Sequence, residues 1–384
     1  MPGGLEQVIG AGIIVLALVD MFATVLYARI NMGPASKLLS RTIWWAFHRV
    51  AGWFPQGRRD LIFSFCGPVV VSAMVLDWAM LLTVGSALLI HPALGTAVVA
   101  SDGATPTDFV TALYAGGGSI AVVGASDFAP KTGPFRLLFL LNSVLGLSLI
   151  SLALTYLMQV YNALQRRNTI ARRIDALTGH TGDAAELVAG LGAHGRFSAG
   201  YTSLSSTADE VGSVTEAHHF YPSLFYFRFR DEVYSVSRFS QVSLDTVSLI
   251  KSGLRDEDAA WFKESAAVTQ LWRAALLLLQ TLTEHYLPGK AGDSEESADQ
   301  AAKARWRGRY VLGLRRLRQA GIRTVEDESA GAENYVALRA EWDRYVRVLS
   351  SALNFSAVEV DPVTADPESV ERRPDFRTRL HSAG

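Results

Sequence analysis

The residues best suited to handle an ion lie between Ala104 and Pro130, in the sequence ATPTDFVTALYAGGGSIAVVGASDFAP. Their chemistry would come from the backbone, because carbonyl oxygens can replace the water around a cation where a non-helical chain lines a path through a membrane. The stretch contains no Lys or Arg. It is also too short and too interrupted by glycine to span a bilayer as one helix. This pattern is typical of a re-entrant pore loop.

The first residues of this loop predict a short helix. Thr105 supplies a hydroxyl N-cap, Pro106 suits the first helical position, and Asp108 can accept amide hydrogens of the first turn. The helix should run from Pro106 to about Gly116, which is about three turns. Its carbonyl end would then stop part-way through the membrane, where its partial negative charge favours a cation.

Side-chain chemistry is sparse elsewhere. Gly190, Gly192 and Gly195 follow no convincing strand, which argues against a dinucleotide-binding domain. The pair His218-His219 matches no strong zinc spacing, and no nucleophile with a base and an orienting group stands out. We therefore expect no enzyme, no cofactor and no metal site. The formal net charge of −1 gives no reason to expect a nucleic-acid partner.

Three long apolar runs must position the loop. They cover Val8–Ile30, Leu61–Ile90 and Leu137–Tyr161, and each is long enough to cross a bilayer. We expect an all-α membrane protein with three transmembrane helices, a re-entrant pore helix and filter in each subunit, and a cytoplasmic helical domain.

Two acidic side chains fall inside these runs. Asp20 and Asp77 each lie near the middle of a span, where a charged group is costly and often functional. Apart from Arg29 at the end of the first run, no Lys or Arg lies within the spans to pair with them. We expect both to be protonated or hydrogen-bonded to Ser, Asn or Trp between helices. A role in coupling the helices is the favoured interpretation, and a role in the ion pathway is the alternative.

The distribution of basic residues predicts the orientation in the membrane. No Lys or Arg occurs from Asp60 through Pro130, whereas the chain between the first two spans and after the third is basic. Basic residues favour the cytoplasmic side. We therefore expect a multi-pass protein of the cell (inner) membrane with its N-terminus outside and its C-terminal half in the cytoplasm. The basic residues are Arg29, Lys37, Arg41, Arg49, Arg58 and Arg59 in the first connection, and Arg166, Arg167, Arg172 and Arg173 after the third span.

The connection between the first two spans predicts an amphipathic helix within residues 34–59. Its apolar residues recur at helical spacing, while Lys37, Arg41 and His48 fall opposite them. We expect this helix to lie in the inner membrane interface. A short soluble helix packed on the cytoplasmic half is the alternative. The apolar set is Leu39, Ile43, Ala46, Phe47, Val50 and Phe54.

The third span combines a polar stripe with two unusual residues. Gly146 lies near mid-span and could be a hinge or a point of close packing. Asn142 could line a cavity or brace the pore helix. One side of the helix predicts a water-lined wall, because four polar residues share it at a period of 3.6. These residues are Ser148, Ser151, Thr155 and Gln159.

Over residues 60–163, the order of span, pore helix, filter and span resembles the two-helix pore module of tetrameric potassium channels. The family's filter reads Thr-Val-Gly-Tyr-Gly followed by Asp. Ala112-Leu113-Tyr114 is similar to the family's pore-helix pattern, and Phe128-Ala129-Pro130 to the residues that follow its filter. The residues that align with the filter without a gap are Val122, Val123, Gly124, Ala125, Ser126 and Asp127. The resemblance implies a homotetrameric channel for a monovalent cation, K⁺ or Na⁺.

Three filter positions differ from the family. Val122 lacks the hydroxyl of the family's threonine, and Ala125 lacks the tyrosine ring that supports the filter. Ser126 stands where the family has a second glycine in an unusual backbone conformation. Gly116-Gly117-Gly118 also replaces bulkier residues, which should thin the packing around the filter. We expect relaxed or altered selectivity. The alternative is a non-conducting membrane receptor or scaffold that retains the pore architecture and signals through its cytoplasmic domain.

The C-terminal half predicts a helical domain that binds an unknown ligand or protein and gates the inner helix. Helical periodicity recurs in 255–287, 301–321 and 332–354. The lipid bilayer is the remaining expected partner.

We divide the chain into a peripheral transmembrane helix (1–33), an interfacial helix (34–59), a pore module (60–163, with the pore loop 104–130 and the inner helix 134–163), a cytoplasmic helical domain (164–357) and a tail predicted to be disordered (358–384).

Overall fold

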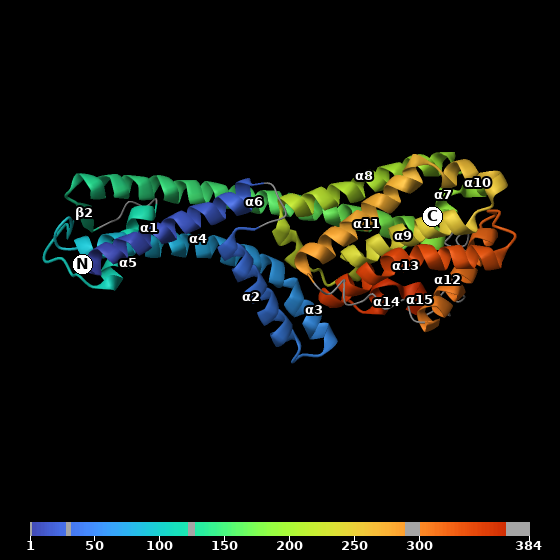
Figure 1. The fold of residues 1–384 in the computed structure, drawn as a ribbon, viewed down its shortest axis with the longest axis horizontal. Helices are drawn as coiled ribbons and strands as arrows, with labels where there is room; N and C mark the ends of the chain where they lie inside the picture. The colour runs from blue at the N-terminus through green and yellow to red at the C-terminus, as the bar shows by residue number, and fades with distance from the viewer. Residues whose placement is uncertain (1, 28–31, 122–126, 289–299, 366–384) are drawn as a thin grey trace, which may run out of the picture. The chain divides into compact units, whose positions relative to one another are not determined.

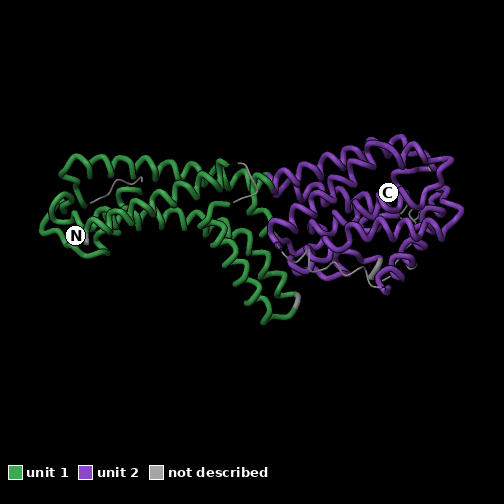
Figure 2. Tube along the Cα trace, viewed as in Figure 1, with its two compact units in different colours: residues 1–162, 219–227 green, residues 163–218, 228–384 purple. Residues whose placement is uncertain are grey.

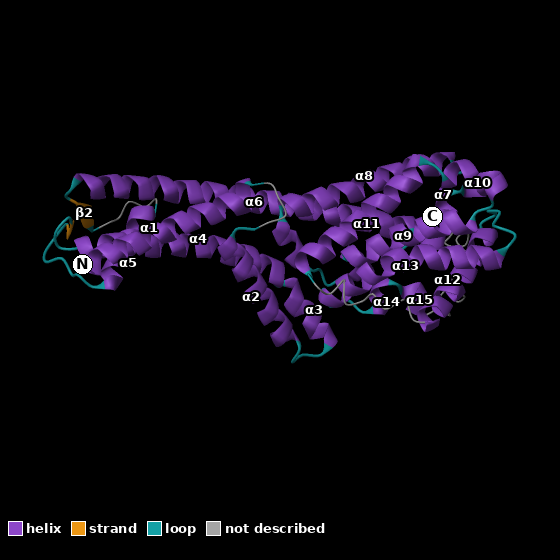
Figure 3. Cartoon of the chain, in the orientation of Figure 1, coloured by secondary structure: helices purple, strands orange, loops and turns teal. Residues whose placement is uncertain are grey.

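The regular structure is almost entirely helical (Figure 3). In the described ranges, the strands are limited to two of three residues each. The chain divides into two compact units (Figure 2). The first unit holds residues 1–162 and 219–227, and the second holds residues 163–218 and 228–384. The computed structural model describes residues 2–27, 32–121, 127–288 and 300–365.

Three helices of the described chain are long and apolar enough to cross a membrane, at Gly3–Leu26, Gly57–Ala93 and Gly133–Leu177, and the last of them continues from the first unit into the second. The chain is therefore an all-α membrane protein. The elements of the first unit, most of them labelled in Figure 1, are α1 (Pro2–Met21), the π-helix η1 (Phe22–Leu26), α2 (Pro34–Ala51), α3 (Gln56–Ser64), α4 (Cys66–Ile90), the 3₁₀ helix η2 (His91–Ala93), β1 (Val98–Ala100), α5 (Phe109–Ile120), β2 (Phe128–Pro130), the first part of α6 (Gly133–Leu177) and the 3₁₀ helix η4 (Pro222–Tyr226).

The second span begins with a break that the apolar pattern does not reveal. The sequence predicts one run from Leu61, but α3 ends at Ser64 and α4 begins at Cys66. Pro68 explains the break, because a proline has no N–H to donate to residue i−4 and its ring clashes with that residue's carbonyl. Residue i−4 is Ser64, where α3 ends.

Glycine allows α1 and α4 to pack closely. A Cβ atom added to Gly10 would lie 2.6 Å from the carbonyl oxygen of Gly85, and one added to Gly85 would lie 2.9 Å from the carbonyl oxygen of Gly10. Both distances are shorter than side chains tolerate. The pair therefore brings the two backbones together, as small residues do between membrane helices.

Helices α2 and α3 lie side by side as a hairpin that leaves the α1–α4 pair (Figure 1). The expected apolar face of α2 is only partly correct. The buried residues are Ser36, Ser40 and Ala51, whereas Val50 is exposed. The small serines face inward because the start of α2 is bonded to Asp20 of α1.

The short helix α5 starts three residues later than the sequence predicts. Its N-cap is Asp108, whose carboxylate accepts a 3.0 Å hydrogen bond from the amide of Thr111. The prediction of Thr105 as the cap was wrong, because the Thr105 hydroxyl instead accepts a hydrogen bond from the amide of Ala100. Strands β1 and β2 pair antiparallel, with Val98 opposite Pro130, and so tie together the two ends of the segment that contains α5.

The second unit is a helical bundle around α9 (Val236–Gly253), which is buried along almost its whole length. Helices α7, α11, α12, α13 and α14 pack against it. The periodic segments of the sequence correspond to α10 with α11, to α12 and to α13. The other elements are α7 (Ala184–Leu191), η3 (Ala193–Gly195), α8 (Ser198–Phe220, whose last two residues fall in the first unit), η5 (Glu232–Tyr234), α10 (Asp256–Lys263), α11 (Ala266–Tyr286), α12 (Gln300–Gln319), α13 (Glu328–Ala352), α14 (Ala357–Val360) and α15 (Pro362–Ala365).

Candidate functional site

The N-terminal end of α5 is held by Asp108 and Thr111. The Asp108 carboxylate accepts hydrogen bonds from both the amide and the hydroxyl of Thr111, and the hydroxyl lies 2.7 Å away. This hydroxyl hydrogen bond is the main reason why the pKa of Asp108 is lowered. A charged carboxylate at a helix N-terminus also matches the positive end of the helix dipole. The start of α5 is thus fixed by local chemistry, outside the membrane-spanning helices.

Glycine brings α5 against α4. A Cβ atom on Gly116 would lie 2.9 Å from the amide nitrogen of Ala87 and 3.2 Å from the carbonyl oxygen of Thr83. The sequence suggested that the three glycines thin the packing around the filter, whose residues 122–126 lie outside the described part of the chain. Within one chain, Gly116 permits direct backbone contact between α5 and α4.

A buried asparagine joins three helices at the C-terminal end of α5. The Asn142 amide of α6 donates a 2.8 Å hydrogen bond to the hydroxyl of Ser119, and its carbonyl accepts one from Ser86 of α4 at 3.2 Å. Ser119 in turn donates to the carbonyl oxygen of Gly116 at 2.7 Å. Asn142 is 1% exposed. Of the two roles left open by the sequence, the geometry therefore matches a brace for α5.

Gly146 is the point where α6 meets the end of α5. A Cβ atom there would lie 1.8 Å from the carbonyl oxygen of Ile120, so no side chain fits. Helix α6 continues through this position without interruption from Gly133 to Leu177. In this structure Gly146 is a close-packing residue. The aligned segment 122–126, with Val122, Val123, Gly124, Ala125 and Ser126, lies outside the described residues.

Asp127 is the part of the predicted filter that the structure describes. Its side chain is exposed, and its carboxylate accepts a 3.3 Å hydrogen bond from the hydroxyl of Tyr114 on α5. The Tyr114 ring also lies edge-on to Phe128, with 6.1 Å between ring centroids. Sequence reasoning noted Tyr114 only as part of a pattern. Its contact with a residue 13 positions later fixes the exit of the loop against α5.

Helix α6 presents three faces of different chemistry within the membrane. One face is buried in the chain, and it carries Leu149, Ala153, Tyr156 and Val160. A second face is the polar stripe, and all four of its residues are exposed. The third face is apolar and equally exposed, with 57–61% of each side chain accessible. Its members are Leu147, Ile150, Leu154 and Met158.

Two hydroxyl groups of the polar stripe donate hydrogen bonds within their own helix. Ser148 donates a 2.8 Å hydrogen bond to the carbonyl oxygen of Val144, and Thr155 donates a 2.9 Å one to that of Ser151. Each of these hydroxyl oxygens can still accept a hydrogen bond. Gln159, one turn further along, is exposed. The stripe therefore offers polar atoms to whatever lies beside α6.

The intramembrane acid Asp20 caps a neighbouring helix. Its carboxylate accepts hydrogen bonds from the amides of Ala35 (2.8 Å) and Ser36 (3.1 Å), from the Ser36 hydroxyl and from the indole Nε1 of Trp78 (2.8 Å). The side chain is fully buried. The positive end of the α2 dipole favours a carboxylate at this position. Asp20 thus joins α1, α2 and α4.

Asp77 differs from Asp20 although it neighbours Trp78 on α4. It is half-buried, and its Oδ2 atom is buried without a hydrogen-bond partner in the described part of the chain. The structure thus does not bring the two acids into one hydrogen-bonded site.

An aromatic segment from the C-terminal half belongs to the first unit. We call residues 219–227 the aromatic clasp. Its Ser223 hydroxyl lies 2.9 Å from that of Tyr156 on α6, and Phe225 packs against Trp44 of α2 with 5.7 Å between centroids. Phe227 covers Gly67 of α4, where an added Cβ atom would meet its ring at 2.5 Å. Sequence reasoning noticed the aromatic composition but assigned the segment to the cytoplasmic domain.

The core of the second unit is a buried network of charges. Arg309 lies 2.7 Å from Asp183 and 3.0 Å from Asp245, and Arg339 lies 3.4 Å from Asp245. Burial raises the pKa of Asp245, while the two guanidinium groups oppose that rise. The described residues contain no group of three side chains arranged to hold a metal ion. The network instead ties α9 to α12, to α13 and to the start of α7.

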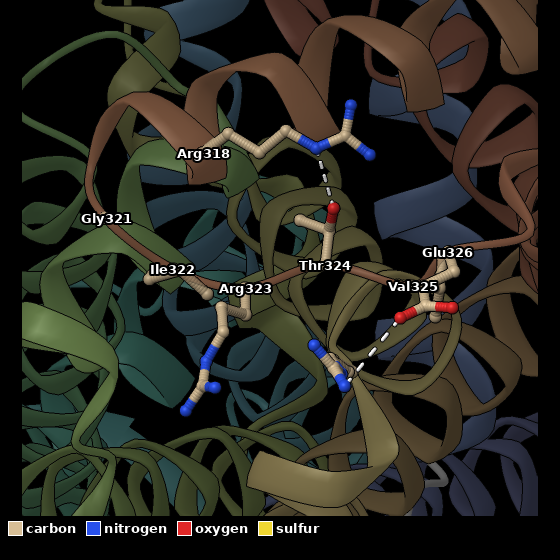
Figure 4. A pocket seen from close by; sticks show the side chains of 8 residues that line it. Arg318, Gly321, Ile322, Arg323, Thr324, Val325 and Glu326 are labelled. Atoms are coloured by element: carbon tan, nitrogen blue, oxygen red, sulfur yellow. Dashed lines mark hydrogen bonds and ion pairs between the residues drawn. The ribbon is translucent and has the colours of Figure 1, made fainter.

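A shallow hollow follows α12 (Figure 4). Each of its arginines has an acidic neighbour: Arg318 is 2.7 Å from Glu328, Arg323 pairs with Asp258, and Arg255 lies 2.8 Å from Glu257. The basic lining is therefore compensated, and the hollow gives little reason to expect an anion. Its residues are Arg255, Arg318, Gly321, Ile322, Arg323, Thr324, Val325 and Glu326.

Comparison with known proteins adds a membrane relative. The chain is similar to the uncharacterized membrane protein YdjJ of Bacillus subtilis (strain 168), with 24% identity over 224 residues. The match covers 58% of this chain and 63% of the relative, so the chain spans less than two thirds of the relative's length. No family profile matches the sequence, and no solved structure matches it.

Proposed function

We propose that the chain forms a homotetrameric ion channel for monovalent cations, with a potassium-channel-like pore and relaxed or altered selectivity. The observation that carries this proposal is the division of α6 into three faces. An inner pore helix needs one face toward its own chain, one toward water and one toward a neighbouring subunit or lipid. The buried face, the polar stripe and the exposed apolar face supply these in turn.

The position of α5 supports the same proposal. It is short, capped at its start and clamped at its end by Asn142 and Gly146. A fixed helix that stops inside the membrane can aim its negative end at a cation. The carbonyl groups of Val122, Val123, Gly124 and Ala125 then replace water around the ion, and four copies complete the ring.

The aromatic clasp supplies a route for gating. It lies against α6 at Tyr156 and against α4 at Gly67, and the chain on both sides of it continues into the helical bundle. A ligand or protein that moves the bundle therefore pulls directly on a segment packed against the inner helix. In this proposal the N-terminus lies outside and the bundle lies in the cytoplasm, as the basic residues favour.

Ion flux into liposomes tests the proposal. Purified protein should pass K⁺ or Na⁺ but not Cl⁻, and the polar-stripe variant Thr155→Leu should lower the flux. The exposed apolar residue Leu154 provides a matched control, because Leu154→Met leaves the stripe intact. Failure to pass any of the three ions, from protein whose inner gate is shown to be open, would overturn the channel.

A non-conducting receptor or scaffold is the second candidate. Val122, Ala125 and Ser126 favour it, because each removes a feature of the potassium-channel filter that the chain resembles. On this alternative, the combined variant Val122→Thr, Ala125→Tyr and Ser126→Gly gains K⁺ current from a silent wild type. Current through the wild type rejects the receptor.

A further inference from the structure

The α2–α3 hairpin has an open face in addition to the one packed against α4. We call this open face, with its connecting turn, the hairpin face. Leu38, Trp45 and Trp53 are 69%, 64% and 78% exposed. These are the apolar members of the face, and its exposed basic members are Lys37, Arg41, Arg49 and Arg58.

This mixture suits only one environment. Hydrocarbon would accept the tryptophans but not four cationic side chains, whereas water would accept the cations and leave large apolar rings exposed. The interface between lipid and water accepts both, since tryptophan prefers that depth and basic side chains reach the headgroups. Arg49 illustrates the combination, because its guanidinium lies 5.9 Å from the centre of the Trp45 ring.

The attachment of α2 places the hairpin face near a membrane boundary. The first turn of α2 is bonded to Asp20, which lies six residues before Leu26, the last residue of the first spanning helix. Six residues of helix correspond to about 9 Å. Helix α2 therefore leaves the spanning helices within the last two turns of the first span, at the level where the lipid headgroups begin.

The charges of the hairpin favour an anionic partner. Residues 34–65 contain five basic side chains and a single acidic one, Asp60. Arg59 is committed to the backbone, because its Nε donates a 2.6 Å hydrogen bond to the carbonyl oxygen of Phe54. The other four side chains are exposed. Positive charge at this level attracts the anionic lipids of a cytoplasmic leaflet.

We propose that the hairpin face binds the headgroups of anionic phospholipids, through Lys37, Arg41, Arg49 and Arg58, with Trp45 and Trp53 at the depth of the glycerol. The site rests on the proposed orientation of the protein but not on conduction. The Asp20 carboxylate holds the start of α2 and also contacts α4 through Trp78. Lipid bound at the hairpin face would therefore also affect how α1 and α4 pack.

A fluorophore on the hairpin tests this directly in the full chain. Cys66→Ala removes the single cysteine, and Gly57→Cys then provides a labelling site where an added Cβ atom meets nothing within 4 Å. Gly308→Cys on α12 is equally open and serves as the matched control. Both proteins carry an environment-sensitive label and are reconstituted in phosphatidylcholine vesicles with increasing phosphatidylglycerol.

The label at residue 57 should shift to the blue as phosphatidylglycerol increases, and nitroxides attached near the headgroup should quench it. Each basic residue near an anionic surface contributes about a fivefold effect. Arg58→Gln should therefore need about fivefold more phosphatidylglycerol for half the shift. Arg305→Gln on α12 should change nothing, and high salt should weaken the response.

Two results would overturn the proposal. The first is the same emission in neutral and anionic vesicles, with no effect of Arg58→Gln. The second is a blue-shifted label that the lipid nitroxides do not quench, which would mean that protein covers the face. Neither measurement depends on ion flux, so loss of the channel proposal would leave this one standing.

Discussion

Gly146→Ala is the sharpest test of the contact between α5 and α6. The new Cβ atom would lie 1.8 Å from the carbonyl oxygen of Ile120, whereas real contacts stay above 3.0 Å. The end of α5 must therefore move away from α6 by about 1.2 Å. Overpacking of this kind costs about 1–3 kcal/mol. An alanine in a helix otherwise stabilises by up to about 1 kcal/mol, so the net loss should be smaller than the contact alone suggests.

The assay is thermal unfolding of the reconstituted protein, together with cation flux. Gly12→Ala in α1 is the matched control, because its Cβ atom meets nothing within 4 Å and the helix propensity changes in the same way. Gly146→Ala should unfold at a lower temperature than Gly12→Ala and change the flux. If both variants unfold together and conduct as the wild type does, α5 does not rest on α6 at Gly146 and the structural reasoning fails.

Three further substitutions test other contacts, each by the unfolding temperature. Asp20→Asn should destabilise by about 1–3 kcal/mol, because an amide hydrogen would face the donors of Ser36 or Trp78; no change would mean that the carboxylate does not cap α2. Asn142→Leu should cost about 1–3 kcal/mol, because it leaves Ser86 without its acceptor; unchanged stability would remove the brace. Arg309→Met should cost about 3–5 kcal/mol by leaving Asp183 and Asp245 buried and unpaired, whereas Arg307→Met on the same helix should have little effect, since its partner Glu333 is exposed. Equal stability of these two variants would contradict the buried network.

The sequence predicts the elements whose signals are local. Three apolar runs give three spanning helices because burial in lipid needs a continuous apolar length. The helices of the second unit follow from their periodicity. The start of α5 shows the limit of such local signals. Thr105 and Asp108 are both good caps, and a hydrogen bond from the amide of Ala100 to Thr105, in the loop that follows β1, decides between them.

The candidate site depends on partners that are distant in sequence. Asp20 is recognisable as an intramembrane acid, but its partners lie 15 to 58 residues away. Only the folded chain shows that it caps α2. The aromatic clasp is more extreme, because Ser223 meets Tyr156 across 67 residues. Its aromatic density was the available signal, and composition alone does not say which unit the segment joins.

The contacts on α6 suggest how the proposed gate and the proposed pore communicate. Gly146, which meets the end of α5, and Tyr156, which meets the aromatic clasp, lie on the same buried face of one uninterrupted helix. Ten residues of helix separate them by about 15 Å. A rotation of α6 driven at Tyr156 would therefore move the surface on which Ile120 rests, without any bend at Gly146. In this arrangement α6 moves as one rigid helix, and the absence of a side chain at Gly146 sets how closely α6 approaches α5.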